Sequence, residues 1–182
     1  MLKKNKPFVI ALCGYTGAGK SYVANILEKK IDCVVLRSDI IRKELAGIDI
    51  SVHVYDDFEK GIYSKDMTER VYSEMFERAK KAIMNSKNVI LDASFLEKEK
   101  RDKLREFVRT LGVKLFILWI EASPFLIKRR LEKRRDDVSD GRWEIYLKQR
   151  EKYEKPLEED VMYIKNDGKI HKRIEEFIRK IL

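Results

Sequence analysis

Eight consecutive residues near the N-terminus have the types and spacing of a phosphate-binding loop. The segment Gly14-Tyr15-Thr16-Gly17-Ala18-Gly19-Lys20-Ser21 fits the pattern G-x-x-x-x-G-K-[ST] without a gap. In such a loop the glycines let backbone N–H groups surround phosphate oxygens, and the following helix adds partial positive charge. We expect Lys20 to reach the β- and γ-phosphates and the Ser21 hydroxyl to join the Mg²⁺ shell. The alternative is a plain glycine-rich turn.

ATP is the nucleotide that the sequence favours for this loop. GTPases carry the same loop, but they read guanine with an N-K-x-D element after a later strand. The nearest candidate here, KNDG at residues 165–168, does not fit that element. We therefore expect ATP and Mg²⁺ as the cofactors.

Asp39 and Arg42 form the second candidate group. They follow the apolar run CVVLRS at residues 33–38, and ligands of open α/β sheets gather at the carboxyl ends of strands. Asp39 is a candidate general base for an attacking hydroxyl. Arg42, three residues further along a helix, lies on the same face and is a candidate for holding the acceptor or the developing charge. Asp39 also suits a helix N-cap, and the two roles are compatible.

Asp92 ends another apolar run, NVILD at residues 88–92. A Walker-B-type acid occupies this kind of position, where it fixes Mg²⁺ through water or holds the loop serine. Ser21 and Asp92 are therefore the candidate metal-binding residues. The competing role for Asp92 is a cap of the next helix, although Ser94 is better placed for it.

A strongly basic helix is expected at residues 123–135, where six cationic side chains accompany a single acid, Glu132. Arg130 and Arg134 are four residues apart and share a face, and a polar break (DDVSDG) follows. This arrangement is typical of a lid, at about residues 123–152, whose arginines close over the β- and γ-phosphates. The alternatives are a solvated face or a track for a nucleic-acid backbone.

The elements that must position these residues alternate between strands and helices. Apolar runs predict strands at residues 8–13, 33–38, 88–92, 113–121 and 161–165. Helical patterns predict helices at residues 20–30, 40–46, 68–85, 123–135, 142–152 and from 169 onward. A capping box of Ser94 and Glu97 opens a further helix that runs to Leu111. Residues 47–66 lose all periodicity and predict a long acceptor-side insert. The order predicts one domain, residues 1–182, with a doubly wound five-stranded parallel sheet.

Composition narrows the class of protein without naming a ligand. The 182 residues carry a net charge of +9, which suits either an anionic partner or a Lys/Glu-rich surface of the thermophile type. Two cysteines are too few for a disulfide framework, and they read as small core residues in a reducing compartment. The apolar run at residues 8–13 is too short for a signal peptide or a membrane span. We expect a soluble cytoplasmic protein with no membrane partner.

Five segments together resemble a known family. GYTGAGKS, RSDIIRKELAG, YSKDMTERVYSEM, NVILDASFL and RRLEKRRDDVSD are similar to the small kinases of the P-loop superfamily often labelled AAA-type ATPases, over essentially the whole chain. More distantly, the chain resembles the kinase module of polynucleotide 5′-kinases. That resemblance implies Asp39 as base, Arg42 as acceptor contact and an Arg130–Arg134 clamp on the donor, with Asp92 as the acid ending the third strand.

The motifs and the resemblance predict a kinase that moves the γ-phosphate of ATP to a hydroxyl. The acceptor is either a small metabolite or the 5′-hydroxyl of a polynucleotide. Net charge favours the polynucleotide, whereas residues 47–66 show no pattern of a nucleic-acid site and no repair domain accompanies the kinase. The alternative is a nucleotide-switched binding protein that hydrolyses ATP without an acceptor. The sequence predicts neither the acceptor nor the oligomeric state.

Overall fold

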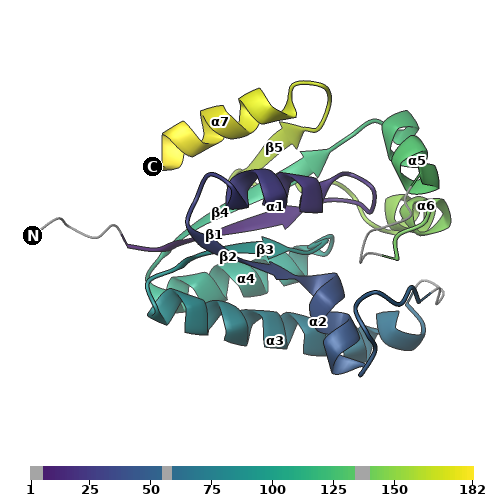
Figure 1. Ribbon diagram of the computed structural model, residues 1–182, viewed down its shortest axis with the longest axis horizontal. Coiled ribbons are helices and arrows are strands. Elements are labelled where there is room, and N and C mark those ends of the chain that lie inside the picture. The colour runs from purple at the N-terminus through teal and green to yellow at the C-terminus, as the bar shows by residue number, and fades with distance from the viewer. Residues whose placement is uncertain (1–5, 55–58, 134–139) are drawn as a thin grey trace, which may run out of the picture.

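The computed structural model describes residues 6–54, 59–133 and 140–182. Its five strands form one sheet in the order β2-β3-β1-β4-β5, and every neighbouring pair is parallel (Figure 1). The strands are β1 (Phe8–Cys13), β2 (Cys33–Arg37), β3 (Asn88–Asp92), β4 (Lys114–Glu121) and β5 (Val161–Lys165). The predicted doubly wound parallel sheet is confirmed.

Helices cover both faces of the sheet. Figure 1 shows α1 and α7 on one face and α3 and α4 on the other, with α2, α5 and α6 beyond the carboxyl ends of the strands. The helices are α1 (Lys20–Glu28), α2 (Ser38–Leu45), α3 (Lys65–Met84), α4 (Lys98–Leu111), α5 (Pro124–Lys133), α6 (Trp143–Lys152) and α7 (Ile170–Ile181), and a 3₁₀ turn, η1, spans Gly61–Tyr63.

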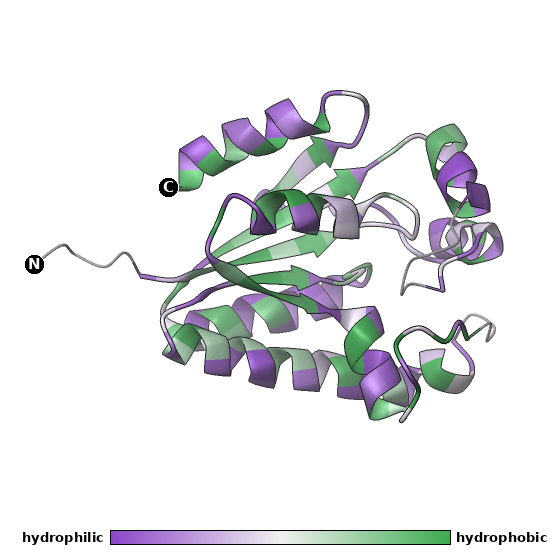
Figure 2. Ribbon diagram, viewed as in Figure 1, coloured by the Kyte–Doolittle hydropathy of each residue, from purple (hydrophilic) through white to green (hydrophobic). Residues whose placement is uncertain are grey.

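The central strand β1 is buried along its whole length because both of its faces are covered. Successive side chains of a strand point to opposite faces. Val9, Ala11 and Cys13 accordingly pack with the α3–α4 layer, whereas Ile10 and Leu12 pack with the α1–α7 layer. Figure 2 shows the same division, with apolar strands between helices whose outer faces are polar. Each buried aliphatic side chain stabilises the fold by roughly 1.5–3 kcal/mol.

Three helix starts differ from the sequence predictions, and one of them is that of α3, which begins at Lys65 and not at residue 68. Helix α2 begins at Ser38 with Arg37 as its N-cap, so Asp39 lies in the first turn and is not the cap. Helix α4 begins at Lys98, and its N-cap Glu97 makes no side-chain capping bond. The predicted Ser94–Glu97 capping box is therefore wrong. Ser94 instead contacts the phosphate loop, because its carbonyl accepts a hydrogen bond from Gly14 N at 3.0 Å.

Helices α5 and α6 form the described part of the predicted lid. Ser123 caps α5 through a hydrogen bond from Leu126 N, as the sequence predicts. The two helices share a small core of Ile127, Leu131 and Tyr146. The helix predicted to reach residue 135 ends at Lys133 in the described part of the chain, and Arg134 lies outside it. No helix among the described residues is long and apolar enough to cross a membrane.

Candidate active site

The phosphate loop is held in a backbone shape that requires glycine. Gly14 and Gly19 have φ angles of 137° and 96°, in the region that residues with a Cβ rarely adopt. A Cβ on Gly14 would also lie 2.6 Å from the carbonyl oxygen of Ile120 in β4. The first glycine of the motif therefore follows from the close approach of the loop to the sheet, independently of any ligand.

Neighbouring elements fix the loop from two sides. On the lid side, Tyr15 donates its hydroxyl to the Tyr153 carbonyl at 2.6 Å, and Thr16 N donates to Gln149 Oε1 at 2.8 Å. On the other side, the loop after β5 brings Asn166, whose Nδ2 donates to the Ala18 carbonyl at 2.8 Å. The loop is thus already shaped by protein contacts.

Parallel pairing brings Asp92 to the base of the loop. The register places Leu12 of β1 and Arg37 of β2 opposite Asp92 on its two sides. Asp92 is 5 % exposed, and its carboxylate accepts a hydrogen bond from Ser21. Arg37 lies between them, with Nε 3.5 Å from Asp92 Oδ2 and Nη2 3.3 Å from Ser21 Oγ. The local sequence around Arg37 predicts no role for it.

Burial raises the pKa of the Asp92 carboxyl above its ordinary value. The charges of Lys20 and Arg37 and the hydrogen bond from Ser21 oppose this shift, whereas the charge of Asp39 adds to it. Lys20 itself donates from Nζ to the carbonyls of Gly14 and Tyr15 at 3.0 and 3.1 Å. The carboxylate, the hydroxyl and the ammonium predicted for this site therefore lie together.

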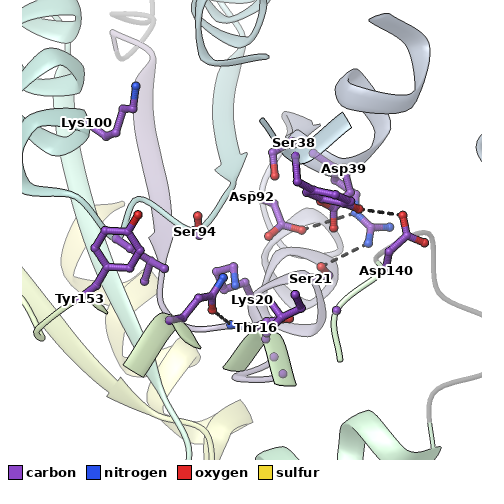
Figure 3. Close-up of a pocket in the computed structure, with 18 of the residues that line it drawn as sticks. Thr16, Lys20, Ser21, Ser38, Asp39, Asp92, Ser94, Lys100, Asp140 and Tyr153 are labelled. Atoms are coloured by element: carbon purple, nitrogen blue, oxygen red, sulfur yellow. Dashed lines mark hydrogen bonds and ion pairs between the residues drawn. The ribbon is translucent and has the colours of Figure 1, made fainter. Parts of the chain in front are cut away.

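A cavity of about 1030 Å³ opens above this group. Of the predicted residues, it is lined by Thr16, Gly17, Gly19, Lys20, Ser21, Asp39, Arg42, Asp92 and Arg130, whereas Gly14, Tyr15 and Ala18 are not part of the lining. Figure 3 shows Ser21, Asp92 and Asp39 close together, with Lys100 and Tyr153 on the far side of the pocket. The cavity thus joins the phosphate loop to a region that could hold a second molecule.

Arg42 reaches the cavity from within a buried setting. It is 6 % exposed, and its Nη1 donates to the carbonyl of Ile62 at 2.8 Å and to Thr68 Oγ1 at 3.3 Å. Its guanidinium lies over the ring of Tyr63, 4.9 Å from the centroid. Within the described part of the chain, its Nε makes no hydrogen bond. The predicted neighbourhood of Asp39 and Arg42 is therefore present, with Arg42 fixed by the insert.

Arg130 lies at the nucleotide end of the cavity. Its Nη1 donates to the Ala18 carbonyl and its Nη2 to the Asn166 carbonyl, each at 3.1 Å. Burial lowers its pKa, but a guanidinium stays charged at any working pH. Arg130 therefore joins the phosphate loop to the loop after β5, and its predicted partner Arg134 lies outside the described residues.

Besides Arg37, sequence reasoning missed several residues of the cavity lining, among them Asn166, Gln149, Lys100 and Asp140. Asn166 follows β5 directly, so the rule that ligands gather at the carboxyl ends of strands could have indicated it. The other three lie on helices or in the polar break before α6, where no local pattern distinguishes them from solvated residues.

The donor set at Ser21 and Asp92 fits Mg²⁺. This ion takes oxygen ligands and is usually held in phosphoryl-transfer sites by one or two protein groups, the rest being waters and phosphates. A hydroxyl and a carboxylate joined by a hydrogen bond supply those groups. Among the described residues there is no group of three or more His, Cys, Asp and Glu that could hold a metal ion.

The fold and the phosphate loop define a P-loop protein of the kinase-like class. The sequence matches the profile of the family described as AAA domain over residues 9–156, and the chain belongs to that family. No curated protein sequence matches it significantly.

Solved structures of kinases share the fold. APS kinase CysC of Mycobacterium tuberculosis, in complex with AMPPNP and APS, has a TM-score of 0.68 at 20% identity, with 96% of each chain covered. A gluconokinase from Sinorhizobium meliloti 1021 has 0.63 at 20% identity, covering 97% of this chain and 99% of that chain. A sugar kinase from Janibacter sp. HTCC2649 has 0.65 at 16% identity, covering 96% and 93%. At such identities the likeness concerns the fold.

Proposed function

We propose that the chain is a Mg-ATP-dependent phosphotransferase that moves the γ-phosphate of ATP to a hydroxyl of a small molecule. The observation that carries this proposal is the placement of Asp39 in the same cavity as Lys20, Ser21 and Asp92. A carboxylate at that place can take the proton of a hydroxyl that attacks the terminal phosphate.

The nucleotide end of the cavity holds the triphosphate. Lys20 and the loop amides bind the β- and γ-phosphates. Bound between Ser21 and Asp92, Mg²⁺ would neutralise charge on the β- and γ-phosphate oxygens. Arg130 is held at this end by its hydrogen bonds to the carbonyls of Ala18 and Asn166. This position suits a cation that stabilises the negative charge of the phosphates. A matching contribution from Arg134 remains a sequence-based prediction.

At the acceptor end, Asp39 and Arg42 have separate roles. Asp39 accepts the proton of the acceptor hydroxyl, and Arg42 orients the acceptor with donors that its contacts to Ile62 and Thr68 hold in place. The rate then depends on positioning and charge neutralisation, as is usual in phosphoryl transfer.

Charge in the acceptor end favours a small molecule over a polynucleotide. Away from the nucleotide end, the described lining has six acids and four cationic residues. The acids are Asp39, Glu59, Glu69, Glu97, Glu99 and Asp140, and the cations are Arg42, Lys65, Lys100 and Lys152. Lys100 and Lys152 are paired with Glu69 and Glu59. A polynucleotide backbone needs an excess of cations, which the described lining of this end does not have although the whole chain is basic.

Hydroxyl groups complete the acceptor end. Tyr63, Thr68, Tyr72, Ser94 and Tyr153 all line the cavity. Side chains that donate and accept hydrogen bonds suit an acceptor that itself carries several hydroxyls. The named kinases of similar fold, an APS kinase, a gluconokinase and a sugar kinase, agree with a small acceptor.

The test is transfer of label from γ-labelled ATP with Mg²⁺. The purified protein is offered a pooled metabolite extract, 5′-hydroxyl RNA and DNA oligonucleotides, and an acceptor-free control. We expect label on a small molecule, identified by mass. Label on the oligonucleotides would instead make the chain a polynucleotide kinase. Free phosphate released at the same rate in every tube, with nothing labelled, would favour the nucleotide-switched ATPase.

Replacement of Asp39 separates the kinase from the switch. We expect Asp39→Asn to lower transfer by roughly 100- to 10,000-fold, the contribution of a general base, while the ATP dissociation constant stays within about threefold of the parent value. Asp32→Asn is the matched control, because Asp32 precedes β2 at the opposite end of the sheet and its side chain is 81% exposed. Full transfer activity in the Asp39 variant would disprove its role as base.

A further inference from the structure

Asp140 lies at the centre of a polar cluster outside the phosphate site, in which the aspartate and a lysine are buried and a histidine is partly exposed. Its Oδ2 accepts a hydrogen bond from the Tyr63 hydroxyl at 2.7 Å, and its Oδ1 lies 3.1 Å from His53 Nδ1 and 3.5 Å from Lys43 Nζ. The side chains of Lys43 and Asp140 are each 1% exposed. We call Lys43, His53, Tyr63 and Asp140 the Asp140 cluster; Figure 3 shows Asp140 at the edge of the pocket, on the same side as Asp39.

Three separate parts of the chain meet in the Asp140 cluster. Lys43 comes from α2, His53 and Tyr63 come from the insert, and Asp140 comes from the segment that leads into α6. Lys43 Nζ also donates to the carbonyl of Ile50 at 3.2 Å, which holds a further point of the insert. Buried charges are costly unless they are paired and hydrogen-bonded, so these parts are held in place only together.

The cluster continues directly to the acceptor end of the cavity. The ring of Tyr63 lies under the guanidinium of Arg42, at 4.9 Å. Burial, followed by the negative charge of Asp39 and the hydrogen bond to Asp140, raises the pKa of Tyr63, so its hydroxyl remains a donor. The position of Asp140 therefore determines where Tyr63, and through it Arg42, can lie.

The same lid contacts the nucleotide end. Gln149 of α6 accepts a hydrogen bond from Thr16 N at 2.8 Å, and Arg130 of α5 donates to the Ala18 carbonyl at 3.1 Å. A salt bridge between Lys152 and Glu59 also joins the lid to the insert, but both side chains are about one third exposed. Water and salt therefore weaken this salt bridge. The Asp140 cluster is a buried connection between the two ends, since the side chains of Lys43 and Asp140 are each 1% exposed.

We propose that Asp140 is a positioning residue that couples the lid to the acceptor insert, so that closure over the nucleotide also orders the insert around the acceptor. The proposal rests on the proposed function in that it takes the phosphate loop as the nucleotide site. By linkage, nucleotide and acceptor then bind with positive coupling. Phosphate transfer to water is suppressed, because the insert and the lid close as one unit.

The test needs no knowledge of the acceptor and no phosphate transfer. Amide hydrogen exchange is measured on the insert, residues 48–54 and 59–64, with and without the non-hydrolysable ATP analogue AMPPNP and Mg²⁺. We expect AMPPNP to slow exchange of these amides by about 5- to 100-fold, the usual size of coupling between sites. In Asp140→Asn this protection is lost, while AMPPNP still binds with a dissociation constant within about threefold of the parent value.

Two more variants separate coupling from plain structural support. Tyr63→Phe removes only the hydroxyl that donates to Asp140 and keeps the ring under Arg42, so we expect partial loss of protection, and this variant serves if Asp140→Asn does not fold. Glu144→Gln is the matched control, because it removes one exposed carboxylate from the first turn of α6 and should retain full protection.

The outcomes separate this proposal from the proposed function. AMPPNP that binds the parent protein without protecting the insert would overturn the coupling, as would full protection in both Asp140→Asn and Tyr63→Phe. If the Asp140 cluster is only a static cross-link, its variants should show melting temperatures lowered by the same amount with and without AMPPNP, and the protection of the insert should be unchanged. That result would also overturn the coupling. Failure of the parent protein to bind AMPPNP would instead contradict the nucleotide site itself.

Discussion

Asp92 carries its negative charge in a place that burial disfavours. Its pKa is raised by burial, even though Lys20, Ser21 and Arg37 all favour the charged form. A buried carboxylate that is ionised at neutral pH lowers the stability of the native state relative to a neutral side chain of the same shape. Sites that bind ions often retain such a group at the expense of stability.

We expect Asp92→Asn to raise the free energy of unfolding by roughly 1 kcal/mol at pH 7, because the amide keeps the shape without the charge. Transfer activity should fall roughly 100-fold or more, because a metal-binding oxygen is lost. Thermal or urea unfolding and the labelled-ATP assay measure the two effects. A variant that is less stable and fully active would contradict the assignment.

The pH dependence of this difference has a definite sign. A raised native pKa contributes stability that is present below the unfolded pKa and is lost as pH rises through the native pKa. The advantage of Asp92→Asn over the parent should therefore be greatest at neutral pH and disappear below about pH 4, near the unfolded pKa of an aspartate. Urea unfolding at several pH values measures it, and an advantage that grows toward acid would contradict the argument.

Residues within a local motif could be predicted from the sequence, and residues joined only by folding could not. Lys20 and Ser21 follow from the phosphate-loop pattern, and Asp39 and Asp92 follow from their positions at strand ends. The bond between Tyr63 and Asp140 joins residues 77 positions apart. Nothing in the local sequence around either residue indicates that partner.

At the scale of elements, the phosphate loop depends on its close packing against β4. Gly14→Ala would place a Cβ 2.6 Å from the Ile120 carbonyl oxygen, at a φ of 137°. A backbone oxygen in a central strand cannot move aside as a flexible side chain would. We therefore expect a loss of about 2 kcal/mol or more in unfolding free energy, measured by urea titration.

Gly112→Ala is the control for this prediction. Gly112 also has a positive φ, 63°, but nothing lies within 4 Å of its Cβ position. The substitution should therefore cost only the backbone strain, about 1 kcal/mol. Equal losses in the two variants would show that the contact with β4 does not matter.

Helix positions could be predicted, but their first residues could not. Apolar periodicity, together with capping and break residues, located the seven α-helices of the described chain, most of which bury several apolar side chains on one face. The starts of α2 and α4 were misplaced because Asp39 and Ser94 are good capping residues by local preference, yet Ser94 is engaged by Gly14 and by the Tyr72 hydroxyl. For residues 47–66 there was no periodicity to interpret, and the described part of this range makes long-range contacts with Asp140 and Lys152.

At the scale of the whole molecule, the two cysteines lie at different depths in the fold. Cys13 ends the buried central strand and Cys33 begins the edge strand β2, and both thiols are free. Burial raises the pKa of Cys13 to about 12 and that of Cys33 to about 11. The reactive thiolate is therefore scarce in the native protein near neutral pH.

We expect a thiol reagent at pH 8 to modify Cys33 before Cys13, because an edge strand opens locally and the central strand only in global unfolding. The rate of thiol modification at Cys13 should follow the free energy of unfolding. In the Cys33→Ser variant the reaction of Cys13 can be measured alone. Since these raised pKa values add stability that is lost as pH rises from about 9, both sites should react faster in alkali than thiolate formation alone explains. Prompt reaction of Cys13 in native buffer would contradict the fold.

The overall architecture was the part that the sequence predicted best. A strand buried on both faces has a continuous apolar sequence, and five such runs separated by amphipathic helices allow few arrangements other than a parallel sheet. The strand order, the arrangement of the described part of the insert, and the contacts of α5 and α6 with the phosphate loop depend on packing between distant segments, which periodicity does not encode.

The strand order β2-β3-β1-β4-β5 bears on how such a chain can diversify. The acceptor end is built largely from one uninterrupted stretch, residues 33–111, that lies between α1 and β4. Under the proposed function, a single recombination event that exchanges this stretch would install a new substrate range and keep the phosphate loop, the lid and the loop after β5. Three features must arrive with the new stretch: a carboxylate just after its first strand, as in Asp39, a carboxylate at the end of its second strand, as in Asp92, and a hydroxyl from which Asp140 can accept a hydrogen bond. A chimaera built on those three rules would inherit the coupling as well as the chemistry.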